Sequence, residues 1–164
     1  MCLQVFWTSS SWWLIEQYSF TDAFRPQFPI VGAVSVDTLY RSQPLLFWTI
    51  VTLTVSRLPD HDCIEAFRRV RAVFESTLHE QIFVAPLPLH KIQVLLLLCQ
   101  WPLPVDTQPH DPSWLYAGLA LQASRIMSLG RQEVITHMQS LGLGSTSILN
   151  RINTWLGCFY VSVS

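Results

Sequence analysis

Two strongly apolar segments near the middle of the chain, residues 89–100 and 114–129, constrain the fold most. The first leaves no side suited to solvent, and the second contains small residues that let another backbone approach closely. A loop rich in proline and aspartate joins them. Apolar segments of this length are typical of buried helices. They predict a buried helical hairpin on which any core must be built.

Proline, aspartate and glycine mark the predicted ends of these two helices. Pro102 stops the first helix, because proline lacks the amide donor and restricts the residue before it. Asp111 is the predicted N-cap of the second helix, with Pro112 at its first position. Gly130 is predicted to end that helix in a left-handed conformation.

An extended arm is predicted near the beginning of the chain. In residues 20–36, Pro26 and Pro29 are incompatible with a regular helix. The sequence FRPQFPIVG therefore indicates an anchored arm whose Phe28 and Ile30 reach a core.

Two further helices are predicted between this arm and the hairpin. Residues 43–57 are apolar nearly all round, with Ser42 as the N-cap; their β-branched content also suits a strand, but their length favours a helix. Residues 62–82, capped by Asp60 or Asp62, form an amphipathic helix. Its apolar stripe consists of Cys63, Phe67, Val70, Phe74, Leu78 and Ile82.

After the hairpin, residues 131–140 predict a short polar helix and residues 141–147 a flexible turn. Residues 148–159 predict a final helix. Its candidate caps are Ser145, Thr146 and Ser147. Together the segments predict an all-α fold, an irregular multi-helix array.

The chain carries little charge for its size. Half of its 164 residues are apolar and 13% are charged, against about 25% charged in an average globular domain. Its mean hydropathy is +0.32, and the last predicted helix stops without a polar tail. We therefore expect an incomplete fragment of a larger helical domain, with apolar surface left open where other segments would pack.

Several partner classes are disfavoured by the sequence. A membrane-spanning helix needs roughly 20 nearly continuous apolar residues, and the longest apolar runs here are shorter. The net charge is −1, and the arginines in residues 68–71 are flanked by Glu65 and Glu75, so direct nucleic-acid binding is not expected. The four cysteines lie far apart, which predicts small buried hydrophobes in a reducing compartment.

No complete catalytic or metal-binding motif occurs in the sequence. His79 and Glu80 begin the HExxH pattern, but Phe83 stands where the second histidine must lie. Residues 142–147 begin a GxGxxG pattern but end in serine. There is neither a P-loop nor a GxSxG elbow. We therefore predict that the chain is not an enzyme and has no catalytic, cofactor-binding or metal-binding residue.

Three polar groups are candidate functional sites, but a structural role is expected for each. Residues 60–63 gather potential metal ligands, but aspartates at a helix start are usually caps. His110 and Asp111 are likewise expected to serve the loop and the cap. Arg125 lies in a mostly apolar helix, where it is expected to snorkel or to pair with a carboxylate rather than to contact an effector.

Four segments, taken in order, carry a family resemblance. They are SQPLLFWTIVTLTVSR, PLHKIQVLLLLCQWPLP, DPSWLYAGLALQASRIMSLG and RINTWLGCFYVSVS. This series resembles the middle homology region, or fungal-specific transcription factor domain, of fungal zinc-cluster transcription factors, and FRPQFPIV resembles the arm that precedes it. The resemblance covers residues 20–164 and is most specific at 93–104, 113–130 and Arg151 with residues 154–156.

The resemblance implies that residues 20–164 are a truncated form of this regulatory domain, with residues 1–19 an unassigned extension. Such a domain controls transcription activation in the nucleus through partners and metabolites. The partners implied are other parts of a full-length transcription factor or proteins of the transcription machinery. The chain has no six-cysteine cluster, so zinc is expected only in the N-terminal cluster of a full-length member, and no direct DNA contact is expected here. SLGR at 128–131 departs from the family's LGLH.

One alternative stays open at this point. A stand-alone helical module that binds an apolar ligand or docks to a membrane surface would also need a helical fold. Residues 62–82 are the candidate amphipathic helix for it.

Overall fold

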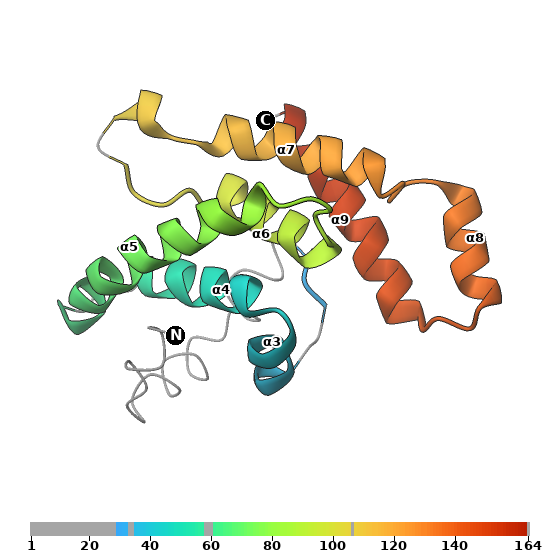
Figure 1. The fold of residues 1–164 in the computed structure, drawn as a ribbon, viewed down its shortest axis with the longest axis horizontal. Coiled ribbons are helices and arrows are strands. Elements are labelled where there is room, and N and C mark those ends of the chain that lie inside the picture. The colour runs from blue at the N-terminus through green and yellow to red at the C-terminus, as the bar shows by residue number, and fades with distance from the viewer. Residues whose placement is uncertain (1–28, 33–34, 58–60, 106, 164) are drawn as a thin grey trace.

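Helices account for the regular structure in the described part of the chain (Figure 1). The computed structural model describes residues 29–32, 35–57, 61–105 and 107–163; the side chains of residues 61–63 and 66 are not described. The helices are α3 (Val36–Ser42), α4 (Pro44–Ser56), α5 (His61–Ile82), α6 (Leu89–Gln100), α7 (Ser113–Ile126), α8 (Gln132–Ser140) and α9 (Ser145–Val163), with a 3-10 turn η2 (Gln108–His110). The predicted all-α class is confirmed.

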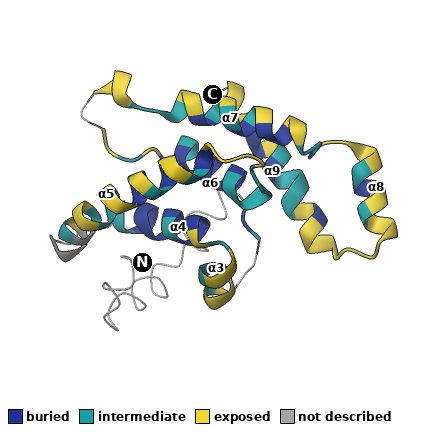
Figure 2. Cartoon of the chain, in the orientation of Figure 1, coloured by how far each residue is buried: buried dark blue, intermediate teal, exposed yellow. Residues whose placement is uncertain are grey.

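Helix α6 lies at the centre of the fold and packs against α4, α7 and α9. Its predicted limits, residues 89–100, agree with the structure. Residues 94–98 are all at most 3% exposed, so α6 is buried all round, as its sequence predicts. In Figure 1, α4 and α5 lie on one side of α6 and α7 on the other, while α8 and the start of α9 project at one end. Figure 2 shows how burial differs between these helices: α6 is buried, whereas α8 is largely exposed.

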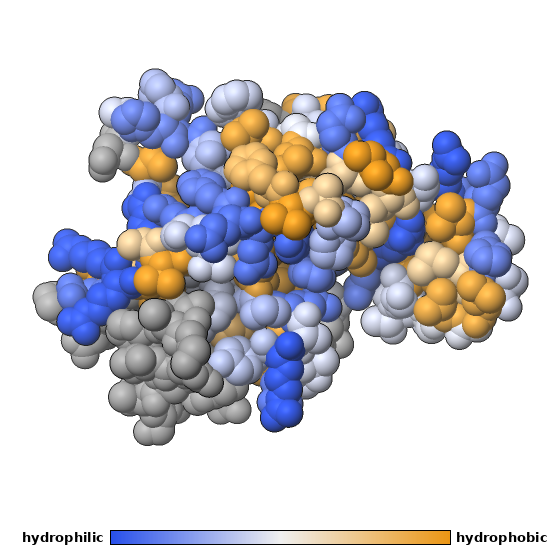
Figure 3. Space-filling view, viewed as in Figure 1, coloured by the Kyte–Doolittle hydropathy of each residue, from blue (hydrophilic) through white to orange (hydrophobic). Residues whose placement is uncertain are grey.

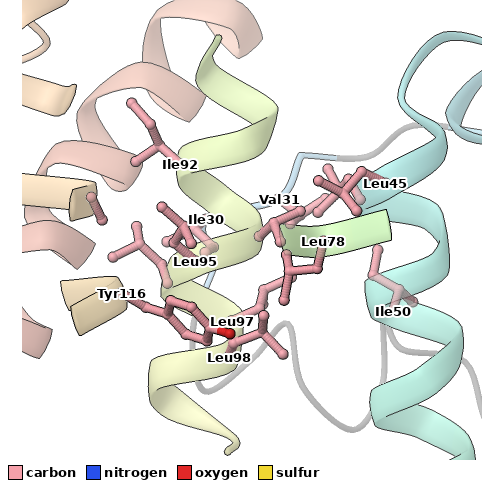
Figure 4. Packing of buried hydrophobic residues seen from close by; sticks show 14 of the residues in the cluster. Ile30, Val31, Leu45, Ile50, Leu78, Ile92, Leu95, Leu97, Leu98 and Tyr116 are labelled. Atoms are coloured by element: carbon pink, nitrogen blue, oxygen red, sulfur yellow. The ribbon is translucent and has the colours of Figure 1, made fainter. Parts of the chain in front are cut away.

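The core extends from α6 to the arm and to α5 (Figure 4). Ile30 and Val31 of the arm are buried beside Leu95 and Leu78. The prediction that Ile30 reaches the core is therefore confirmed, whereas Phe28 lies outside the described residues.

The region before α4 differs from the prediction. Ser42 does not cap α4; it is the last residue of α3, a helix that was not predicted, and its hydroxyl donates to the Thr38 carbonyl oxygen at 2.6 Å. Gln43 is the N-cap of α4, and Pro44 takes the first helical position, where its missing amide costs no hydrogen bond. Ser35 starts α3 by accepting a hydrogen bond from the Thr38 amide at 3.3 Å.

The amphipathic helix α5 begins at His61, within a residue of the predicted start. Phe74, Leu78 and Ile82 of its stripe are at most 2% exposed, and α5 packs against α4. This part of the stripe is therefore occupied by the protein's own core and is not free to dock on a membrane. Asp60 and the Cys63 side chain lie outside the description. Among the described residues, no helix combines the length and apolarity needed to cross a bilayer.

Helix α7 ends earlier than predicted. It stops at Ile126, not at residue 129, and the left-handed residue after it is Ser128, with φ of 52°. Gly130 does not have a positive φ, so its predicted role as a left-handed helix terminator is wrong. At the other end Pro112, not Asp111, is the N-cap, although the Asp111 carboxylate still accepts from the Ser113 amide at 2.9 Å.

The last two helices follow the predicted order with one change in length. Helix α8 confirms the short polar helix, with Arg131 as its N-cap. Helix α9 spans Ser145–Val163 and is longer at both ends than the predicted 148–159. The proposed caps at residues 145–147 therefore lie in its first turn, and the Gly144 carbonyl accepts from the Ser147 amide at 3.0 Å. Gly142, with φ of 71°, supplies the left-handed residue of the turn.

Candidate functional site

A buried polar contact joins α6, α9 and the arm. The Gln93 amide, 5% exposed, donates from Nε2 to the Ile30 carbonyl oxygen at 2.6 Å and to Thr154 Oγ1 at 3.1 Å. The Thr154 hydroxyl in turn donates to the Asn150 carbonyl oxygen at 2.7 Å. Buried polar groups are stable when they are paired, so Gln93 fixes the arm and α9 at the same point of α6.

Arg151 and Trp155 hold α9 against the end of α7. The Arg151 guanidinium donates to the Met127 carbonyl oxygen just after α7, a position where cations are favoured. Burial lowers the pKa of Arg151, and its Nε has no hydrogen-bond partner among the described residues. The Trp155 indole lies directly over Gly130, where a Cβ would collide with it. A side chain at 130 would therefore displace α9.

These contacts lie in the segments in which the family resemblance is most specific. Five residues in these contacts belong to the most specific segments of the resemblance and lie where α6, α7 and α9 meet: Gln93, Gly130, Arg151, Thr154 and Trp155. Their role in the described structure is to fix the position of α9.

A cleft of about 310 Å³ lies between α5, the end of α6 and the connection to α7. Its apolar lining includes Leu78, Leu98 and Leu103, which we call the apolar floor. Its polar groups come from α5, from the connection and from the first turn of α7. They are Arg71, Glu75, His79, His110, Asp111, Ser113 and Tyr116. A concave site with an apolar floor and a few polar groups is typical of small-molecule sites.

Several polar groups of the cleft are held in place by local contacts. Arg71 Nε donates to Glu75 Oε1 at 2.8 Å, one helical turn away. The Asp111 carboxylate accepts from both the amide and the hydroxyl of Ser113, at 2.9 Å and 2.5 Å. Tyr116 is only 6% exposed and packs beside the α6 leucines (Figure 4). Burial, followed by Glu75, Cys99 and Asp111, raises the pKa of its hydroxyl, which is therefore a neutral phenol near pH 7.

A second surface is an apolar face on the outside of α9. We call it the outer face; it consists of Leu149, Leu156, Phe159 and Val163, which are 49% to 82% exposed. Successive members of the face are separated by whole helical turns, so they lie along one side of the helix. The opposite side of α9, with Thr154 and Cys158, is buried. Exposed apolar residues also gather over α7 and over the turn between α8 and α9 (Figure 3).

The polar residues singled out from the sequence fall into two groups. His79, His110 and Asp111 line the same cleft, which sequence reasoning missed because it considered His79 on α5 separately from His110 and Asp111 in the connection. A signal was present, since Arg71, Glu75 and His79 recur every four residues on one side of a helix. Arg125 does not join them; it is exposed on α7, as expected for a residue that reaches solvent. Glu65 and Arg69 form the expected pair, with Nε and Oε1 3.0 Å apart.

The structure also shows the surroundings of two cysteines and of the possible metal ligands. Cys158 is buried and Cys99 is half-buried, and both are free thiols. Burial, then Asp111 and Cys158, raises the pKa of Cys99 to about 12. Within the described residues, no three His, Cys, Asp or Glu side chains are close enough to hold a metal ion. The side chains of residues 60–63 lie outside that description.

The fold and its two surfaces define an all-helical domain with a polar cleft and an exposed apolar helix face. Comparison with known proteins gives the family. Residues 15–162 match the family described as "Fungal specific transcription factor domain". The chain belongs to this family, which confirms the resemblance read from the sequence. No solved structure matches the chain.

Curated relatives include proteins named as transcription factors in yeasts. "Putative transcription factor SEF1" of Kluyveromyces lactis is 32% identical over 146 residues, which are 86% of this chain and 12% of the relative. The Saccharomyces cerevisiae protein of the same name is 30% identical over 149 residues, 88% of this chain and 12% of the relative. "Transcriptional regulatory protein SEF1" of Candida albicans is 27% identical over 147 residues, 86% of this chain and 16% of the relative. The chain thus spans a small part of the length of the relatives it matches.

Proposed function

We propose that residues 20–164 form a regulatory, non-catalytic domain of a fungal zinc-cluster transcription factor that works in the nucleus. The domain controls transcription activation through contacts with other parts of a full-length transcription factor or with proteins of the transcription machinery. Binding of a small metabolite is a second input to the same domain. DNA contact and zinc belong to a separate module of the full-length protein.

The exposed outer face of α9 is the observation that supports partner binding. Apolar side chains aligned on one side of a helix are typical of surfaces that dock onto another protein. The other side of α9 is fixed on α6 and α7 by Thr154, Arg151 and Trp155. The outer face is therefore presented on a rigid support. The family match and the names of the relatives support a role in transcription.

A tethered reporter assay tests this function. The full chain is fused to a bacterial DNA-binding module and a constitutive activation segment, and reporter transcription is measured in yeast. We expect the chain to lower the output severalfold and Leu156→Asp on the outer face to restore it. Gln122→Asp, an exposed change on α7 outside that face, is the matched control and is expected to leave the repression intact. An output unaffected by the chain would refute a regulatory role.

A further inference from the structure

The cleft between α5 and the α6–α7 connection has an excess of negative charge. Arg71 is paired with Glu75 through a contact of 2.8 Å, and its guanidinium lies 5.8 Å from the centre of the Phe67 ring. The Asp111 carboxylate accepts from the neutral amide and hydroxyl of Ser113. With His79 and His110 counted as neutral, Arg71 against the two carboxylates leaves a formal charge of −1 among the side chains that line the cleft.

Tyr116 lines the cleft together with the carboxylates of Glu75 and Asp111. Its hydroxyl pKa is raised by burial and, among charged groups, by Glu75 and Asp111. Both carboxylates therefore act on the same buried point, although one comes from α5 and the other from the connection before α7. A cation placed there would be attracted, whereas an anion would be repelled.

The size and floor of the cleft limit what that cation can be. A volume of about 310 Å³ is at the small end of ligand pockets. Leu78, Leu98 and Leu103 offer contact to a short hydrocarbon body but no hydrogen bond. A bare metal ion is a poor match to such a floor, because ions of that kind require several oxygen ligands around them.

We propose that this cleft binds a small organic cation, an amine on a short apolar body. The ammonium group donates to the carboxylates of Glu75 and Asp111 and to the Tyr116 oxygen, and the hydrocarbon lies on the leucine floor. Such a ligand would link α5 to the start of α7. This inference names the chemical class of the metabolite input and rests on the proposed function.

Binding of matched probes to the full chain tests the inference. Isopentylamine, isovalerate and isopentyl alcohol share one branched five-carbon skeleton and differ in charge. Each is titrated near pH 7 against the thermal midpoint followed by tryptophan fluorescence, with calorimetry for affinity. We expect a saturable rise in the midpoint with the amine and none with the other two. Equal or stronger binding of isovalerate, or no saturable binding of the amine, would overturn the proposal.

Variants locate the binding. Glu75→Gln and Asp111→Asn each remove one charged acceptor and are expected to weaken the amine about tenfold. Arg71→Gln removes the competing positive charge and is expected to strengthen it. Glu133→Gln on exposed α8 is the matched control and should change nothing. An affinity for the amine that neither Glu75→Gln nor Arg71→Gln changes would contradict the assigned site.

The reporter assay separates this inference from the proposed function. Repression by the tethered chain without amine binding would refute the cleft ligand and leave the regulatory role standing. Amine binding without any effect of the chain on the reporter would refute the regulatory role and leave the site assignment standing.

Discussion

Replacement of Gly130 by alanine tests how α9 is fixed to the rest of the fold. A Cβ at this position would run into the Trp155 indole, at Cε2 and Nε1. Overpacking of this kind typically costs about 1–3 kcal/mol. The loss of glycine's freedom in the unfolded chain offsets about 0.4–1 kcal/mol. We therefore expect Gly130→Ala to destabilise the chain by about 1.3 kcal/mol, the difference between the midpoints of those two ranges.

Gly118 offers a matched control within the same chain. It lies in the middle of α7, and a Cβ there would meet nothing within 4 Å. Alanine in an exposed helix interior is favoured over glycine by roughly 0.5–1 kcal/mol. Gly118→Ala should therefore stabilise the chain, and the two substitutions, chemically identical, are expected to have opposite signs. Urea unfolding followed by circular dichroism at constant pH measures both.

A double-mutant cycle assigns the cost to the indole. In a Trp155→Leu background the colliding ring is absent, so Gly130→Ala should lose most of its effect. The reasoning is refuted if Gly130→Ala stabilises the chain as Gly118→Ala does, or if its cost is the same with and without Trp155.

Three further changes test other parts of the structure. Gln93→Leu removes the donor to the buried Ile30 carbonyl and should cost about 1–3 kcal/mol in urea unfolding, with faster proteolysis of the arm; an unchanged midpoint would contradict this. Thr52 Oγ1 is buried without a hydrogen-bond partner among the described residues, so Thr52→Val should raise the stability of the chain. Thr49→Val is the control, because it loses a 2.8 Å hydrogen bond to a carbonyl oxygen and should not raise stability. Equal effects of the two substitutions on the urea midpoint would refute this prediction. Burial raises the pKa of the Cys99 thiol from 9.0 to about 12. Its contribution to stability is therefore full below pH 9 and is lost as the pH rises from 9 toward 12, where the unfolded thiol ionises before the folded one. Cys99→Ala should flatten that part of the pH–stability profile.

The central helices were predictable because local signals determine them. Helix α6 has the predicted limits because residues 94–99 form a continuous apolar run and prolines flank the helix on both sides. Helix α5 was predictable because its apolar residues recur at spacings of three and four. In both cases the residues that determine the helix lie within it or next to it.

The errors arose where a distant residue decides the outcome. Gly130 looks like a helix terminator in sequence, but it is required because Trp155 of α9 occupies the space above it. Ser42 looks like an N-cap, but a short helix capped by Ser35 already contains it. The cleft was missed for the same reason, since Glu75 of α5 and Asp111 of the connection before α7 are far apart in sequence but line the same cleft beside Tyr116. Sequence spacing shows neighbours along one helix and not neighbours between helices.

The structure gives α9 two faces with separable roles. Its inner face carries Arg151, Thr154 and Trp155, whose contacts set the position of the helix, so changes there alter stability first. Its outer face carries Leu156 and Val163, which are 57% and 82% exposed; exposed positions away from special features usually change stability by no more than about 0.5 kcal/mol. A substitution on the outer face that abolishes repression without moving the unfolding midpoint would therefore act through a partner, whereas one on the inner face affects partner binding only through the position of the helix.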